Sequence, residues 1–71
     1  MRSNAKLTKT VGRRVRKFRR DIGMTQEELA SKARISSTYI GYIEQGRNLP
    51  SLDVLRRIAK HLQVNFSELM D

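Results

Sequence analysis

The chain has 71 residues and no cysteine, with 15 Lys and Arg against 7 Asp and Glu, giving a formal net charge of +8. A chain this short forms one small domain and leaves little room for a large catalytic cleft. The lack of cysteine excludes disulfides and thiolate metal sites, which fits a reducing compartment. No apolar run approaches the roughly 20 residues that cross a bilayer, and residues 1–10 lack the apolar region of a signal peptide. We therefore expect a cytoplasmic protein with no membrane partner.

The positive charge is concentrated in the first 20 residues, which we expect to begin with a flexible basic arm over residues 1–7. This segment has no acidic residue and nine basic ones: Arg2, Lys6, Lys9, Arg13, Arg14, Arg16, Lys17, Arg19 and Arg20. From residue 48 onward, basic and acidic residues balance. Such an uneven charge indicates a polyanionic partner, with nucleic acid first and an anionic membrane surface second. Charge alone also fits a merely soluble basic protein.

Helical spacing of apolar residues predicts a first helix that ends at Gly23 and a second that begins after Thr25. Thr25 and Glu28 match a capping box, in which each side chain accepts a hydrogen bond from a free backbone N–H at the helix start. The residues expected to face the core from these two helices are Val11, Val15, Phe18, Ile22, Leu29, Ala30 and Ala33.

Three more helices follow. Ser36 is a favourable N-cap for a third helix that Gly46 ends. A fourth runs from about Ser51 to Leu62, after a loop containing Pro50. Asn65 and Glu68 suggest the cap of a short last helix. The residues expected to face inward from the fourth helix are Leu52, Leu55, Ile58, Ala59 and Leu62, and the last helix carries Phe66, Leu69 and Met70. The chain shows no strand-like alternation, so the predicted class is all-α with five helices.

The third predicted helix has one side without charged or bulky aliphatic residues. At about 100° per residue, Ile40 and Ile43 face the core. Another side, within about 140°, holds Ser37, Thr38, Gly41, Tyr42 and Gln45. An ordinary solvent-exposed side would carry Lys and Glu. A helix in the DNA major groove needs small neutral side chains for base edges, while surrounding basic residues hold phosphates. Periodicity also allows an undistinguished polar side.

The span TQEELASKARISSTYIGYIEQGRNLPSLDVLRRIA resembles the Cro/CI-type helix-turn-helix family of bacterial and phage regulators. The resemblance covers roughly residues 11–69, and the residues at family spacing are Gln26, Ala30, Ile35, Ile40, Ile43, Glu44 and Gly46. It implies a compact five-helix, lambda-repressor-like domain over residues 8–71. The family implies a transcriptional regulator or repressor that binds double-stranded operator DNA as a homodimer on a pseudo-palindromic site. The run Thr38-Tyr39-Ile40 is particularly similar to the controller proteins of restriction–modification systems.

The resemblance also implies roles for individual residues. Base contacts fall on Ser37, Thr38 and Tyr42, within a recognition helix over residues 37–45. Backbone contacts fall on Gln26, Tyr39, Gln45, Arg47 and Asn48, and the family residue at the position of Gln26 often helps a neighbouring base contact as well. Ser37 is shorter than the Gln or Arg common in relatives, so its contact would be weak or water-mediated. Arg34 occupies a turn where the family prefers Gly at positive φ, which would cost about 1 kcal/mol. We expect tolerated strain there, with a phosphate contact as the alternative.

Two further expectations concern assembly and stability. The resemblance places a buried ion pair at Arg19 and Glu44, and both residues lie beside the predicted apolar faces of their helices. The last helix is expected to form a dimer interface through Phe66, Leu69 and Met70. The alternative is that these three residues close the core of a single chain.

No motif indicates an enzyme. His61 is the only histidine, and the chain has no carboxylate pair, phosphate-binding loop or ligand cluster. We expect no cofactor, metal or small-molecule ligand, and a location on the nucleoid of a prokaryote or in a phage context. The main alternative function is an antitoxin-like or coactivator-like module that binds a protein partner through the same fold.

Overall fold

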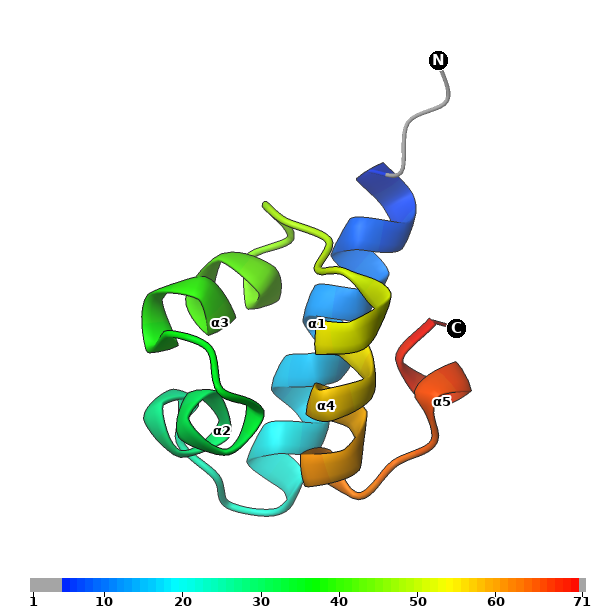
Figure 1. Ribbon diagram of the computed structural model, residues 1–71. Helices are drawn as coiled ribbons and strands as arrows, with labels where there is room; N and C mark the ends of the chain where they lie inside the picture. The colour runs from blue at the N-terminus through cyan, green and yellow to red at the C-terminus, as the bar shows by residue number, and fades with distance from the viewer. Residues whose placement is uncertain (1–4, 71) are drawn as a thin grey trace.

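The computed structural model describes residues 5–70, and this part of the chain folds into five α-helices with no strand. They are α1 (Ala5–Asp21), α2 (Gln26–Ala33), α3 (Ser37–Glu44), α4 (Leu52–Leu62) and α5 (Phe66–Met70). α1 and α4 pack together through the middle of the domain, with α2 and α3 on one side and α5 on the other (Figure 1). The predicted all-α class is confirmed. No helix between residues 5 and 70 has the length and apolar character needed to cross a membrane.

Side-chain caps begin the helices where the sequence placed them. The Thr25 hydroxyl accepts from the Glu28 N–H at 3.0 Å, and the Thr25 N–H donates to the Glu28 carboxylate at 2.8 Å. Ser36 and Ser51 cap α3 and α4 by accepting from backbone N–H groups three residues on. Each cap satisfies a backbone donor that the helix leaves free, which is worth about 1 kcal/mol.

The core is formed by apolar side chains from all five helices. Its buried members are Val11, Val15, Leu29, Ala30, Ala33, Ile40, Ile43, Leu55, Ile58, Ala59, Leu62 and Leu69. Two predicted inward positions are wrong: Ile22 is 42% exposed and Leu52 is 54% exposed. Ile22 lies just beyond the end of α1, and Leu52 is the first residue of α4. Both follow the apolar stripe of their helix but lie at its end, where no neighbouring element covers them.

The start of α1 differs from the expected arm over residues 1–7. The helix already includes residues 5–7, and Leu7 packs against the core. This contact favours helix in a segment that contains neither Gly nor Pro. Residues 1–4 of the predicted arm lie outside the described residues.

In α5, the structure corrects one residue of the expected dimer interface. Leu69 has no exposed surface within a single chain, so it cannot contribute area to a second subunit. Phe66 and Met70 pack against the same core but remain partly exposed. Arg14 of α1 holds α5 in place by donating to the Glu68 carbonyl oxygen at 3.1 Å. Leu69 therefore closes the monomer, while Phe66 and Met70 keep accessible surface.

Candidate nucleic-acid interface

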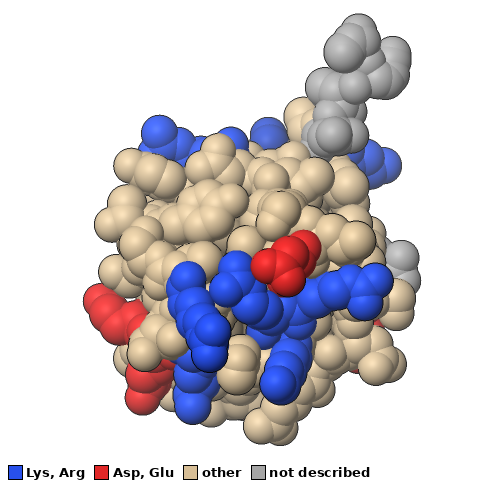
Figure 2. All heavy atoms as spheres, in the orientation of Figure 1, with Lys and Arg blue, Asp and Glu red and all other residues tan. Residues whose placement is uncertain are grey.

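α3 has one side that is apolar and buried, and an outer side that carries no charged residue. Ile40 and Ile43 are fully buried, and burying such side chains contributes roughly 1.5–3 kcal/mol each. The opposite side, which we call the recognition face, is made of Ser37, Thr38, Gly41, Tyr42 and Gln45 and is partly or fully exposed. Figure 2 shows the surface over α3 free of Lys and Arg, with basic side chains above and below it. The predicted neutral side is thus at the surface.

The position of α3 on α1 depends on Gly12. Gly12 is buried, and a Cβ at this position would overlap the carbonyl oxygen of Ile43. The backbones of α1 and α3 therefore cross in direct contact. A larger residue would push α3 away from the domain, so Gly12 fixes how far the recognition face stands out.

The last residue of α3, Glu44, connects three segments through its buried carboxylate. Arg19 of α1 donates from Nε to Glu44 Oε2 at 2.6 Å and from Nη2 to Oε1 at 2.9 Å. The remaining guanidinium nitrogen, Nη1, donates to the Met24 carbonyl oxygen at 2.8 Å. The hydrogen bond to Glu44 raises the pKa of Arg19 above its ordinary value against the opposing effect of burial, so the guanidinium stays charged. The inward-facing ion pair expected from the sequence is present.

Gln26, the first residue of α2, belongs to the same network. Its Nε2 donates to Glu44 Oε1 at 3.0 Å. This bond joins the start of α2 to the end of α3 and fixes the orientation of the amide, because a carboxylate can only accept. Gln26 is partly exposed beside the recognition face. The structure thus brings it to the place where a DNA contact was expected.

Residues after α3 extend the recognition face. The Arg47 guanidinium stacks on the Tyr42 ring, 4.3 Å from its centroid, and Nη1 lies 3.5 Å from Gln45 Oε1. A guanidinium placed this way restricts the Tyr42 ring while leaving its outward N–H groups for an anion. Asn48 is exposed in the loop that follows. Tyr39 is different, since its side chain packs partly against the core on the flank of α3.

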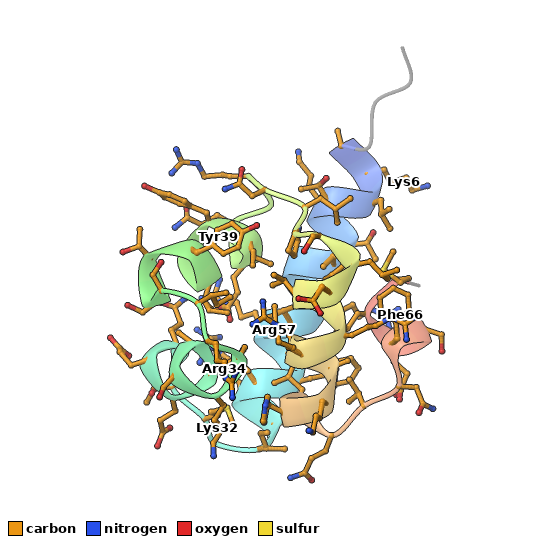
Figure 3. The ribbon with its side chains drawn as sticks, viewed as in Figure 1. Lys6, Lys32, Arg34, Tyr39, Arg57 and Phe66 are labelled. Carbon is orange, nitrogen blue, oxygen red and sulfur yellow. The ribbon has the colours of Figure 1, made fainter. Side chains whose placement is uncertain are left out.

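Arg34 has the backbone conformation expected from its position. Its φ of 62° and ψ of 44° lie in the left-handed region at the end of α2. The Arg34 N–H donates to Ser31 O at 3.3 Å and the Ile35 N–H donates to Ala30 O at 3.0 Å, which satisfies the last carbonyls of the helix. Figure 3 shows Arg34 in the turn between α2 and α3. The predicted positive φ is therefore confirmed.

Lys9 and Arg13 were expected to hold DNA only as members of the basic amino-terminal segment, without a defined place beside the third helix. Both lie on the outer side of α1 and line a hollow with Glu44, Gln45 and Gly46 at the end of α3. The Lys9 side chain packs against Gly46. The signal was present in the sequence, because residues four apart share one side of a helix. What the sequence did not show is that α3 ends beside this side of α1.

The part of the chain that the structure describes holds no candidate metal site. No group of three or more His, Asp and Glu side chains between residues 5 and 70 could hold a metal ion. His61 is partly buried near the end of α4. The chemistry gathered around α3 is hydrogen bonding and positive charge, which suits recognition of a polyanion.

The fold and this surface define a helix-turn-helix domain, and comparison with known proteins agrees. The HTH_3 helix-turn-helix family model matches residues 15–69, so the chain belongs to this Cro/CI-type family. The chain is 41% identical over 58 residues to the uncharacterized HTH-type transcriptional regulator YazB of Bacillus subtilis, covering 82% of this chain and 84% of that protein. It is 38% identical over 61 residues to the immunity repressor of Bacillus phage phi105, covering 86% of this chain but only 42% of that repressor. These relatives are regulators and repressors, not enzymes.

Comparison with solved structures finds regulators with a similar fold. The crystal structure of SinR, the master regulator for biofilm formation, in complex with DNA has a TM-score of 0.82 and 31% identity, covering 86% of this chain and 98% of that one. The restriction-modification controller protein C.AhdI of Aeromonas hydrophila has a TM-score of 0.83 and 31% identity, covering 87% of this chain and 94% of that one. Controller proteins are thus among the structures that this chain resembles.

Proposed function

We propose that the chain is a sequence-specific transcriptional regulator that binds double-stranded DNA with α3 in the major groove. The observation that carries this proposal is the neutral recognition face, held by the buried network around Glu44 and bordered by basic residues. The major groove is about 12 Å wide and accepts one helix when its leading side chains are small. The DNA in the SinR complex supports this docking by analogy within the family.

The individual contacts follow from this orientation. Ser37, Thr38 and Tyr42 lie on the recognition face and would contact base edges. Gln26, Gln45, Arg47 and Asn48 lie around it, and Tyr39 on its flank; they would hold the phosphate backbone. Lys9 and Arg13 join this second group on the geometry of the hollow beside Gln45.

The proposed assembly is a homodimer formed through α5. Phe66 and Met70 supply the accessible apolar surface, and the Arg56 guanidinium lies 5.6 Å from the centroid of the Phe66 ring. Figure 3 shows Phe66 and Tyr39 on opposite sides of the domain, so a partner on α5 would leave α3 free. A two-fold axis would then present two recognition faces to a pseudo-palindromic operator.

Selection of bound sequences from random duplex DNA tests this function directly. The expected outcome is a pseudo-palindrome with half-sites one helical turn apart. Thr38→Ala should then weaken operator binding by about 1–3 kcal/mol while leaving random DNA nearly unaffected. Recovery of no sequence preference, together with co-purification of a protein partner, would favour the alternative of a protein-interaction module.

A further inference from the structure

Gly41 is in the middle of α3, where a glycine weakens a helix that has only eight residues. No contact among residues 5–70 requires a glycine there. Its backbone is helical, and a Cβ at this position would meet only the ends of two side chains, 3.9 Å from Gln45 Nε2 and 4.0 Å from Gln26 Oε1. These are ordinary van der Waals distances. Gly12, by contrast, is required because a Cβ there would overlap the backbone of α3.

Because Gly41 has no side chain, the position that a Cβ would occupy on the recognition face is empty, and we call this space the notch. Two amides border this notch, and their orientations differ. Gln26 uses its Nε2 to donate to Glu44, which leaves its Oε1 facing the notch as an acceptor. Gln45 directs its Oε1 to Arg47 at 3.5 Å, which leaves its Nε2 facing the notch as a donor. One acceptor and one donor therefore lie beside the notch.

This pattern matches one base edge in the major groove. Adenine presents a donor at its N6 amino group and an acceptor at N7, whereas guanine presents two acceptors at O6 and N7. A single Gln side chain often satisfies adenine through both of its amide atoms. Here the two functions come from two side chains, and Gly41 provides the space that lets the base edge come between them.

We propose that Gly41, Gln26 and Gln45 form a base-recognition site for adenine in each half of the operator, with Gln26 Oε1 accepting from N6 and Gln45 Nε2 donating to N7. This proposal rests on the DNA-binding function proposed above. It changes the role of Gln45 from holding the backbone to discriminating bases, and it gives Gln26 a direct contact with one base. It also assigns sequence specificity to Gly41, which has no side chain of its own.

The first test is Gly41→Ala in the full chain. Alanine favours the helix, so the thermal midpoint should rise by several degrees. Operator affinity should fall about tenfold or more, because the methyl group fills the notch, while affinity for random duplex DNA should change less than about twofold. A matched control is Ser31→Ala at an exposed position of α2, about 140° around that helix from Gln26. This control should leave operator affinity unchanged.

The second test identifies the base. At the half-site position where selection returns an invariant adenine, replacement by purine removes the N6 amino group, and replacement by 7-deazaadenine removes the N7 acceptor. Each should weaken binding of the parent protein about tenfold. In Gln45→Ala, which changes an exposed side chain, the effect of 7-deazaadenine should disappear while that of purine remains.

The outcomes separate the two proposals. A parent protein that selects a defined operator but tolerates Gly41→Ala without loss of affinity would overturn the adenine site and leave the regulator function intact. Selection of guanine at every invariant position would likewise overturn the adenine site and leave the regulator function intact. A parent protein that selects no sequence at all would overturn both proposals.

Discussion

Glu44 is the residue on which the geometry of the interface depends most directly, because it accepts two hydrogen bonds from Arg19 and one from Gln26. Replacing it with Gln removes the charge but keeps the size. Removing one partner of a buried ion pair leaves the other charge unpaired and costs about 3–5 kcal/mol. We expect Glu44→Gln to lower the free energy of unfolding by this amount, measured by urea denaturation.

The matched control is Asp21→Asn, which makes the same carboxylate-to-amide change in a surface pair. Lys17 Nζ lies 2.8 Å from Asp21 Oδ2, but both side chains are more than half exposed. Water and mobile ions screen such a pair, so its loss should cost less than about 1 kcal/mol. Equal losses for the two variants would show that burial contributes nothing to the Arg19–Glu44 pair.

Arg34 gives the opposite prediction, since its backbone conformation is unfavourable for any residue with a Cβ. Arg34→Gly relieves this strain, and the greater freedom of glycine in the unfolded chain offsets part of the gain. We expect the free energy of unfolding to rise by a few tenths to about 1 kcal/mol in thermal denaturation. Gln63 has a φ of 63°, so Gln63→Gly should likewise raise the free energy of unfolding.

The same Arg34 variant distinguishes strain from function. If the guanidinium holds a phosphate, Arg34→Gly will weaken binding to all DNA and flatten its salt dependence. If the strain is merely tolerated, DNA binding will stay at the level of the parent protein. The second result is the one we expect.

At the scale of single residues, two expectations that rested on the family resemblance are met. They are the positive φ at Arg34 and the Arg19–Glu44 ion pair. The notch at Gly41 could not be predicted, because it depends on which amide atoms of Gln26 and Gln45 point towards it. Those orientations are set by hydrogen bonds to Glu44 and Arg47, which the spacing of residues in the sequence does not reveal.

At the scale of helices, the residues at which helices begin could be predicted because a cap depends only on residues close to it in the sequence. Thr25, Ser36 and Ser51 each cap the helix that follows them. Helical periodicity gives the direction of a side chain but not whether another element covers it. Ile22 and Leu52 have the expected direction and remain exposed for that reason. Leu69 shows the opposite error, because it was expected at a dimer interface but is fully buried in the core of the single chain.

α5 therefore carries a prediction in two parts. Leu69→Ala removes a fully buried side chain and should cost about 2–5 kcal/mol in the unfolding of the domain. Met70→Lys, at a partly exposed position, should leave the fold intact and lower the fraction of dimer in sedimentation experiments. A dimer that withstands Met70→Lys and Phe66→Lys alike would place the interface elsewhere.

At the scale of the whole molecule, the charge surrounding the recognition face should determine how tightly any DNA is held. Each phosphate contact releases condensed counterions, so affinity falls with salt in proportion to the number of contacts. We expect Arg47→Ala, Lys9→Ala and Arg13→Ala each to flatten the slope of log affinity against log salt concentration by about one unit. Operator and random DNA should lose affinity to about the same extent, because phosphates do not differ between sequences.

The control for this series is Lys60→Ala, which removes the same charge from the last turn of α4. α4 packs on α2 and contributes nothing to the recognition face or to the hollow beside Gln45. The slope of log affinity against log salt concentration for Lys60→Ala should equal that of the parent protein. Equal flattening in all four variants would mean that net charge alone holds the DNA, and no docking of α3 would be needed to explain binding. A change of sequence preference in Arg47→Ala, with Thr38→Ala silent, would instead place base recognition in the loop after α3.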